Sequence, residues 1–169
     1  GAPVTAKAIN TMLKPMLLGK DPGRIGELWE QLCRAINYAG RMGILCSAIS
    51  GVEIALWDIA GKAKNAPVYQ MLGGRAHDQL RAYASLLRYA GPEEVRQACL
   101  VLKKKGYTAI KLHEADVKPV AAAREAVGSG VDLLLDTNCL WDRAKAIEMG
   151  RQFEDYDLYW YEEPLWPPD

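Results

Sequence analysis

The sequence predicts an α/β protein in which a helical first half, residues 1–74, precedes parallel strands that alternate with helices in residues 75–169. Two patterns support this fold class. Up to Gly74, apolar residues recur at the helical spacing of three and four positions, and no stretch reads convincingly as a strand. After Gly74, four short stretches rich in β-branched, aromatic or leucine residues start about 25 residues apart, with amphipathic helices between them. Such a repeat is the βα unit of a parallel sheet.

Two helices are expected in residues 1–74. The first begins at Asp21-Pro22, since Asp is a favoured N-cap and Pro fits the first turn, and it ends at Gly40. Its apolar stripe consists of Ile25, Leu28, Trp29, Leu32 and Ile36. The second begins at Ser47 and ends at Asn65-Ala66-Pro67, with lysines in its last turn where the helix dipole favours cations. Its apolar stripe consists of Ile49, Val52, Leu56, Ile59, Ala60 and Ala63.

The second half is expected to contain strands and helices in turn. The predicted strands are Leu80–Leu86, Ala109–His113, Val131–Asp136 and Leu158–Glu162. The predicted helices run from Pro92 to Lys105, from about Pro119 to Val127, and onward from Asp142. The first of these helices opens with proline and glutamates and closes with lysines and Gly106, an order that complements the helix dipole.

Two parallel architectures compete for this pattern, an open doubly wound sheet and a closed barrel. Open nucleotide-binding sheets usually carry a glycine-rich GxGxxG or GxxxxGK[ST] turn after the first strand. The first strand here runs instead into Leu86-Leu87-Arg88-Tyr89-Ala90-Gly91. A (β/α) barrel needs eight units and typically about 250 residues. The sequence therefore predicts the first half of a TIM-like (β/α) barrel within a longer protein.

The composition excludes several classes of partner. Lys+Arg and Asp+Glu each number 21, so the charges cancel and give no basic footprint for nucleic acid. No run of consecutive apolar residues approaches the roughly 20 that a membrane helix needs, so no membrane partner is expected. The cysteines, Cys33, Cys46, Cys99 and Cys139, form no CxxC pair. Their spacing supports neither a zinc knuckle nor a disulfide framework, and a reducing cytoplasm is expected.

Polar side chains end three successive predicted strands. The second strand ends in Lys111-Leu112-His113, the third in Asp136-Thr137-Asn138 and the fourth in Glu162-Glu163-Pro164. Active sites of parallel α/β folds lie at these carboxyl ends. Strand alternation places the lysine and the histidine of the second strand on the same face.

Each of these elements also has an ordinary structural interpretation. A strand-end aspartate often caps the next turn, a lone histidine is often structural, and a glutamate pair is often a solvated edge. Their succession favours one shared site instead, because carboxylates that converge on one rim repel each other unless a cation or a proton compensates. Oxygen-only ligands favour a hard ion such as Mg²⁺.

The ordered set of motifs resembles the enolase superfamily. The stretch Ala55-Leu56-Trp57-Asp58-Ile59-Ala60-Gly61-Lys62, followed by Pro67-Val68 and Leu72-Gly73-Gly74, is similar to the hinge between its helical capping domain and its barrel. The Lys-x-Lys, Asp-x-Asn and Glu-Glu-Pro patterns of its mandelate racemase/muconate lactonizing enzyme branch occur in the same order, with His113 in place of the second lysine.

This resemblance covers nearly the whole chain and implies two partial domains. Residues 1–74 correspond to the helical part of an α+β capping domain, whose three-stranded sheet precedes Gly1. Residues 75–169 correspond to the first four strands of the C-terminal barrel. The family's third metal ligand, on the fifth strand, and a further catalytic residue, on the sixth or seventh, lie beyond Asp169.

The resemblance also implies roles for single residues. Asp136 and Glu162 are expected to bind Mg²⁺, and Lys111 and His113 to be catalytic. Three further residues, Ser85, Asn138 and Glu163, are expected to face the substrate or support the metal site. A histidine base is chemically reasonable, because enolase-type sites use Lys or His with Mg²⁺.

Two alternatives stay open for the second strand. His113 is either the base or a group that only hydrogen-bonds the substrate, with the base supplied by the missing half of the barrel. Lys111 is either catalytic, favouring the neutral imidazole by its charge, or a counter-charge to Asp136.

The implied reaction is Mg²⁺-dependent removal of the proton α to a carboxylate, through an enediolate whose charge the metal stabilises. Loss of a β-hydroxyl then gives dehydration, and reprotonation gives racemisation or epimerisation. We expect dehydration of a sugar acid, by similarity to the acid-sugar dehydratases of this branch, with a racemase, epimerase or cycloisomerase as the alternative. A catalytically silent binding barrel is the rival from another class. The expected partners are a small carboxylate-bearing substrate and further copies of the chain in a homo-oligomer.

Overall fold

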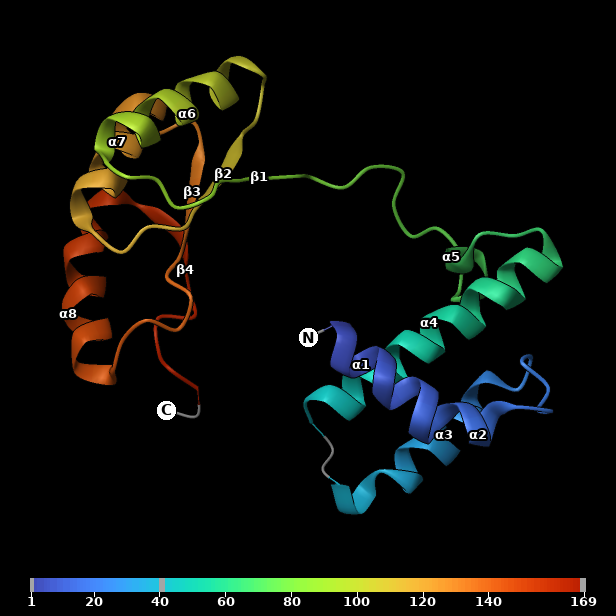
Figure 1. The fold of residues 1–169 in the computed structure, drawn as a ribbon. Coiled ribbons are helices and arrows are strands. Elements are labelled where there is room, and N and C mark those ends of the chain that lie inside the picture. Colours follow the sequence, from blue (N-terminus) through green and yellow to red (C-terminus); the bar gives the residue numbers. More distant parts are fainter. Residues whose placement is uncertain (1, 40–41, 168–169) are drawn as a thin grey trace. The chain divides into compact units, whose positions relative to one another are not determined.

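The structure, a computed structural model, describes residues 2–39 and 42–167. The chain divides into two compact units, Gly1–Asp78 and Gln79–Asp169, which are coloured blue to green and green to red in Figure 1. The described part of the first unit is helical, and the second unit is a layer of helices on a parallel sheet.

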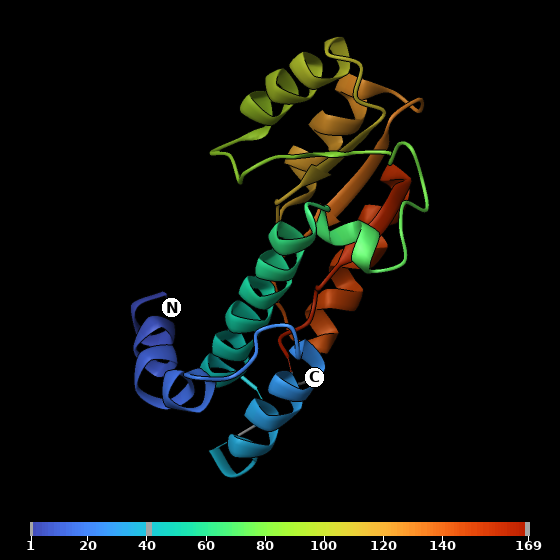
Figure 2. The same cartoon turned by 90° about the vertical axis from the view of Figure 1, so that its right-hand side faces the viewer.

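The first unit consists of helices and short helical turns. In order these are α1 (Ala2–Ala8), η1 (Ile9–Leu13), α2 (Lys14–Leu17), α3 (Ile25–Ala35), η2 (Asn37–Ala39), α4 (Ile44–Lys64) and α5 (Val68–Met71). The longest, α4, is seen along its length in Figure 2. The segment from α1 to α2 had no predicted helix, and its π-helical turn η1 departs from the 3.6-residue period that pattern reading relies on.

Two apolar clusters hold the first unit together. The buried residues of α3 are Ile25, Leu28 and Leu32, and those of α4 include Ala48, Ile49 and Leu56. Most of these buried residues belong to the predicted apolar stripes. Trp29 and Ile59, however, are 45% and 47% exposed. Both stripes are therefore wider than the face that this unit buries.

The predicted start of α3 is wrong by several residues. Its N-cap position is Arg24, whereas the carboxylate of Asp21 accepts a hydrogen bond from the backbone N–H of Gly23 at 2.8 Å in the preceding turn. An aspartate can stabilise a turn in this way as readily as a helix start. The predicted terminator, Gly40, lies outside the described residues.

The predicted start of α4 is also wrong, whereas its end is confirmed. Gly43 occupies the N-cap position, and Ser47 lies inside the helix, where its hydroxyl donates to the Gly43 carbonyl at 3.2 Å. The helix ends at Lys64, and Asn65 follows in the left-handed conformation (φ 49°) that typically closes a helix.

By length and composition, α4 is the one helix in the described part of the chain that could cross a membrane, with a mean hydropathy of 1.5. A single helix of this kind is weak support for a membrane protein, because core helices of soluble proteins pass the same test. The expected absence of a membrane partner therefore stays a prediction.

The second unit contains four strands and three longer helices. In order these are β1 (Ala84–Ser85), α6 (Pro92–Lys104), β2 (Ala109–Leu112), α7 (Val117–Val127), β3 (Asp132–Asp136), α8 (Arg143–Phe153), the short turn η3 (Glu154–Tyr156) and β4 (Leu158–Glu162). The three helices and the strands β2, β3 and β4 lie where the sequence predicts them, whereas the turn η3 was not predicted. The first strand is much shorter than predicted, since the residues before Ala84 form no ladder with β2.

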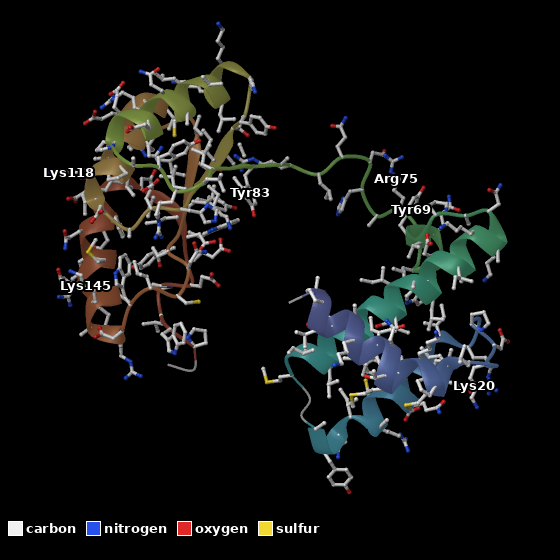
Figure 3. The ribbon with its side chains drawn as sticks, in the orientation of Figure 1. Lys20, Tyr69, Arg75, Tyr83, Lys118 and Lys145 are labelled. Carbon is white, nitrogen blue, oxygen red and sulfur yellow. The ribbon has the colours of Figure 1, made fainter. Side chains whose placement is uncertain are left out.

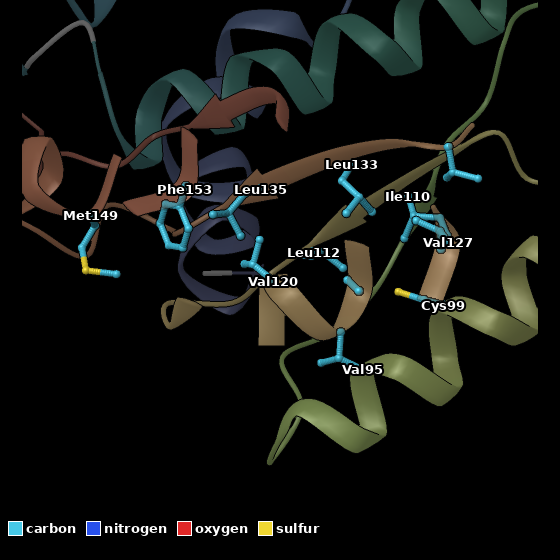
Figure 4. Close-up of a cluster of buried hydrophobic side chains, with 12 residues drawn as sticks. Val95, Cys99, Ile110, Leu112, Val120, Val127, Leu133, Leu135, Met149 and Phe153 are labelled. Atoms are coloured by element: carbon cyan, nitrogen blue, oxygen red, sulfur yellow. The ribbon is translucent and has the colours of Figure 1, made fainter. Parts of the chain in front are cut away.

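One face of the sheet is covered by α6, α7 and α8 and holds the core of this unit. Twelve buried residues form this core: Val95, Cys99, Ile110, Leu112, Val120, Ala123, Val127, Val131, Leu133, Leu135, Met149 and Phe153. Ten of them are labelled in Figure 4. Alternation along β2 and β3 directs Ile110, Leu112, Leu133 and Leu135 toward this core. The residues that alternate with them, including Lys111 and Asp136, therefore lie on the opposite face.

The sheet topology distinguishes the two architectures that the sequence left in competition. All strand pairs are parallel, and the strands follow one another in the order β1-β2-β3-β4. A doubly wound sheet reverses its strand order at a switch point and has helices on both faces. Sequential order with helices on one face is the arrangement of a (β/α) barrel, so the predicted fold class is confirmed.

Candidate active site

The carboxyl ends of β2, β3 and β4 bring the predicted polar residues together on the face without helices. Asp136 pairs with Glu162 in the parallel register, and Lys111 pairs with Leu134 on one side and with Ser85 on the other. Register partners in a parallel sheet point to the same face. All five of these residues therefore lie on the same face of the sheet.

Lys111 is the centre of the site. Its ammonium Nζ lies 2.9 Å from Asp136 Oδ2 and 3.2 Å from each carboxylate oxygen of Glu162. Burial by itself lowers the pKa of Lys111, but the hydrogen bonds to both carboxylates outweigh it and leave the pKa raised. The lysine thus stays charged, which both predicted interpretations require, as a counter-charge to Asp136 and as a positive group beside the imidazole of His113.

Asp136 is buried, and both of its carboxylate oxygens have hydrogen-bond partners. Its Oδ1 accepts two hydrogen bonds from Asn138, one from the backbone N–H and one from the side-chain amide, each at 2.9 Å. Asn138 can turn back in this way because it adopts a left-handed backbone (φ 55°). Burial raises the pKa of Asp136, but the hydrogen bonds from Lys111 and Asn138 more than compensate, so the net pKa is lowered and the carboxylate is ionised.

His113 joins the site from the end of β2 and is half-buried. Its Nδ1 contacts the carbonyl oxygen of Leu86, and its Nε2 lies 3.3 Å from Asp136 Oδ2. Lys111 and His113 thus approach the same carboxylate from the same strand, as alternation predicts. One ring nitrogen faces the backbone and the other faces the charged cluster.

Two aromatic residues complete the site, and the sequence interpretation missed both. Trp160 Nε1 donates a hydrogen bond to Glu162 Oε2 at 3.0 Å, and the ring of Tyr83 lies 5.9 Å from Lys111 Nζ. The two rings meet edge to face, with their centroids 5.7 Å apart. Figure 3 labels Tyr83 near the strands, whereas Lys118 and Lys145 lie on the helical layer. Alternation could have placed Trp160 on this face, since it stands two residues before Glu162 on the same strand, but it does not indicate the contacts.

The remaining predicted residues lie at the edge of the cluster. Ser85 is exposed beside Lys111. Glu163 is also exposed, has a positive φ of 35°, and accepts a hydrogen bond from the Asn138 amide at 3.4 Å. Alternation could not choose between Glu162 and Glu163, and in the structure it is Glu162 that faces Lys111.

The donor set fits part of a site for a hard cation. Two carboxylates from adjacent strands converge on one positive group, the ammonium of Lys111, so their positions favour a cation. Within residues 2–39 and 42–167, no group of three or more His, Cys, Asp or Glu side chains is placed to hold a metal ion. Asp136 and Glu162 would thus supply two of the roughly six oxygen ligands that Mg²⁺ prefers.

Comparison with known families agrees with both units. Residues 1–73 match the N-terminal domain of the mandelate racemase/muconate lactonizing enzyme family. Residues 93–169 match the enolase C-terminal domain-like family. Together the two matches include all the residues of the site except Tyr83, Ser85 and Leu86.

Curated relatives are enzymes of sugar-acid metabolism. The chain is 36% identical to arabinonate dehydratase of Saccharolobus solfataricus, in an alignment that covers 93% of this chain and 44% of that protein. It is 37% identical to D-galactonate dehydratase of Klebsiella pneumoniae (95% and 45% covered). It is 33% identical to 3,6-anhydro-alpha-L-galactonate cycloisomerase of Streptomyces coelicolor (100% and 48%). The chain thus spans about half the length of these relatives.

Solved structures of similar fold also come from the enolase superfamily and from cycloisomerases. The 3,6-anhydro-D-galactonate cycloisomerase of Zobellia galactanivorans superimposes with a TM-score of 0.91 at 35% identity, with 100% of this chain and 49% of that chain covered. A member of the enolase superfamily from Salmonella typhimurium superimposes with a TM-score of 0.89 at 31% identity (100% and 52% covered).

Proposed function

Because the chain belongs to the mandelate racemase/muconate lactonizing enzyme family of the enolase superfamily, we propose that it forms part of an enzyme that removes the proton α to a carboxylate group. One observation carries this proposal. Lys111, His113, Asp136 and Glu162 converge from three adjacent strands at the sheet end where barrel enzymes act.

Removal of such a proton needs a base together with stabilisation of the charge that develops on the substrate. When bound, Mg²⁺ supplies positive charge to the substrate carboxylate as the enediolate forms. Asp136 and Glu162 are the residues that would hold the ion. Asn138 and Trp160 donate hydrogen bonds to these two carboxylates and so fix their orientation.

The base is assigned to His113, and Lys111 assists it. The contact of Nδ1 with the Leu86 carbonyl leaves Nε2 directed toward the site, where it can accept a proton. The raised pKa of Lys111 keeps a positive charge beside the imidazole. A neighbouring positive charge favours the neutral, proton-accepting ring.

We assign the reaction to the dehydration of a sugar acid, which makes the protein a lyase. The arabinonate and galactonate dehydratases named above support this assignment, since each covers most of this chain at more than a third identity. A second candidate is an isomerase, because two cycloisomerases match over the full chain. Both reactions begin with the same proton removal, so the assignment of the site residues does not depend on the choice.

The proposal extends to the surroundings of the enzyme. Its partners are a small carboxylate-bearing substrate and further copies of the chain in a homo-oligomer, and nucleic acid is not among them because the net charge is zero. We also place the protein in the reducing cytoplasm, because its cysteines form no CxxC pair and their spacing supports no disulfide framework.

The test follows the α-hydrogen of the substrate. Full-length protein is incubated with aldonates such as arabinonate and galactonate in deuterated buffer, and exchange and dehydration are followed by NMR. His113→Asn should lower both rates by about 10²–10⁴-fold, the usual contribution of a general base. The matched control is His77→Asn, because His77 is the other histidine of the chain and is exposed.

Three outcomes separate the alternatives. Loss of exchange in His113→Asn with retained Mg²⁺ binding supports the base. A rise in KM with unchanged exchange identifies His113 as a group that only binds substrate. A wild-type protein that binds Mg²⁺ and aldonates without exchange or turnover would be a silent binding barrel, and the proposal would be wrong.

A further inference from the structure

The loop that joins β1 to α6 is fastened to the carboxyl end of β2 by several contacts, and the proposed chemistry uses only the one between Leu86 and His113. The guanidinium of Arg88 donates through Nε to the carbonyl oxygen of His113 at 2.8 Å. The backbone N–H of Tyr89 donates to Glu114 Oε1 at 3.0 Å. The same loop contains Leu86, whose carbonyl contacts His113 Nδ1. The backbone N–H of Leu86 also donates to the Lys111 carbonyl at 2.9 Å. Four contacts thus bind the loop to residues 111–114 at the end of β2.

Glu114 is the least expected member of this set. It is an acidic residue directly after the strand, yet only 4% of its surface is exposed. Burial raises its pKa, and the hydrogen bond from Tyr89 and the charge of Arg88 offset this shift only in part. A buried carboxyl group destabilises the fold unless it is hydrogen-bonded. The contact with Tyr89 therefore holds the side chain and the loop together.

The position of the loop determines which nitrogen of His113 faces the site. The Leu86 carbonyl and the Asp136 carboxylate both only accept hydrogen bonds, and a neutral ring has a single proton to donate to one of them. The closer contact, between Nδ1 and the Leu86 carbonyl, places this proton on Nδ1 and opposes its transfer to the nitrogen that faces Asp136. The other nitrogen, Nε2, then faces Asp136 without a proton of its own. If the loop moved, the ring would lose both its tautomer and its orientation, and Nε2 could no longer receive a proton from a substrate.

We propose that Glu114 is a positioning residue, which acts through Tyr89 and the loop to hold the Leu86 carbonyl against His113 Nδ1. Arg88 has the same role through the His113 carbonyl. In its kinetic consequence this inference rests on the proposed function. The tautomer of His113 can be measured without any substrate.

The experiment compares Glu114→Ala with Glu114→Gln in the full-length protein. Glutamine keeps an oxygen that can accept the Tyr89 N–H, so it is the matched control. Ring-nitrogen NMR on ¹⁵N-histidine protein at about pH 8, where an ordinary imidazole is neutral, reports the tautomer. The signals of His113 are assigned by their loss in His113→Asn. Wild type and Glu114→Gln should show the proton on Nδ1, and Glu114→Ala should show a mixture of both tautomers.

The kinetic readout should follow the same order. Glu114→Ala should lower kcat by about 10²-fold, as for a misplaced catalytic group, with KM little changed and Mg²⁺ affinity retained. Glu114→Gln should restore most of kcat. Arg88→Met should shift the tautomer in the same direction. Because Arg88 is exposed, this variant serves as the test if Glu114→Ala does not fold.

The inference would be overturned by wild-type ring signals in both Glu114→Ala and Arg88→Met, or by equal impairment of the glutamine and alanine variants. A failure of the proposed function looks different. In that case wild type shows no α-hydrogen exchange, yet the tautomer still responds to Glu114→Ala.

Discussion

At the scale of single residues, the site is a balance between one buried ammonium and two carboxylates. Lys111 and Asp136 are both buried, and the pKa shift of each keeps it charged. Removing one member of such a group is more damaging than the small net stability of the pair suggests, because it leaves a buried charge without compensation. The charge states of the residues in this cluster therefore depend on one another. Each substitution in the cluster should be tested for its effect on metal binding as well as on turnover.

Asp136→Asn should weaken Mg²⁺ binding and turnover together, since it keeps the shape of the side chain but removes a negative charge from the proposed site. Loss of residues that only support a metal ligand lowers affinity about 10–100-fold, so loss of a ligand should exceed about 100-fold. Calorimetric titration of the full-length protein with MgCl₂ measures the effect.

The matched control for this substitution is Asp132→Asn. Asp132 lies at the other end of β3, where its carboxylate pairs with Arg81 at 2.6 Å near the surface. This variant should bind Mg²⁺ like wild type. Equal Mg²⁺ affinity in Asp136→Asn and wild type would remove Asp136 from the ligand set.

Cys99 should be inert in the native protein. Burial in the core raises the pKa of its thiol to about 11, so at pH 8 only about one thiol in a thousand is the reactive thiolate. The thiol of Cys46, in contrast, is exposed. Iodoacetamide labelling followed by peptide mass spectrometry should modify Cys99 only after unfolding in guanidinium chloride. Labelling of Cys99 in the native protein as fast as Cys46 would show that this core opens.

At the scale of elements, the sequence predicted the parts of the second unit that follow simple periodicity. The strands β2, β3 and β4 and the helices between them lie within a few residues of their predicted bounds. The predicted helix start at Asp142 is confirmed, and its carboxylate caps the helix by accepting a hydrogen bond from the Lys145 N–H at 2.8 Å. The two wrong helix starts, at Asp21 and Ser47, came from residues whose side chains also form hydrogen bonds in turns and inside helices, and not only at N-caps.

The parts of the site that sequence reasoning missed depend on contacts between elements. Trp160 and Tyr83 lie on the predicted face, but nothing local indicates that an indole N–H reaches Glu162 or that a ring covers Lys111. Glu114 lies one position beyond the predicted strand end, where alternation no longer determines direction. Its partner, Tyr89, is separated from it by the whole of α6.

Two glycines of α4 should respond to alanine in opposite ways. A Cβ at Gly51 would meet only Ile9 Cδ1 at 3.9 Å, an ordinary contact, so Gly51→Ala should raise the free energy of unfolding by about 1 kcal/mol. A Cβ at Gly61 would lie 2.8 Å from the carbonyl oxygen of Ala66. This close approach forces the chain after the helix to move, so Gly61→Ala should instead lower the free energy of unfolding, by about 1–3 kcal/mol.

Urea denaturation followed by circular dichroism measures both variants. The comparison is internal, because both positions lie on one helix and the substitution is the same. A gain of stability in Gly61→Ala equal to that in Gly51→Ala would contradict this prediction. It would show that the turn after α4 can move away from the added methyl group without strain.

At the scale of the whole molecule, the parallel sheet ends at β1 and β4, which pair with no further strand in the described part of the second unit. Large apolar side chains near these edges are exposed, namely Leu80, Leu87, Tyr159 and Trp166. Beside β1, an apolar groove of about 610 Å³ lies along α6 and is lined by Leu86, Ala98, Val101 and Leu102 among others. Open edges with apolar surroundings favour association with other chains, and a closed barrel removes them. The matched relatives, which are about twice as long, have the additional chain that closure needs.

Residues 1–169 produced alone should therefore associate or precipitate, whereas a longer protein that continues the barrel should elute as one defined oligomer. Size-exclusion chromatography with light scattering distinguishes the two. The physical cause can be tested separately by adding charge at the edges, since lysines on edge strands oppose pairing with other chains. Leu80→Lys together with Tyr159→Lys should reduce association of the short chain, whereas Lys118→Ala, an exposed position on α7, should not. If residues 1–169 are monomeric and unfold cooperatively without these lysines, the four strands are sufficient by themselves and the half-barrel interpretation is wrong.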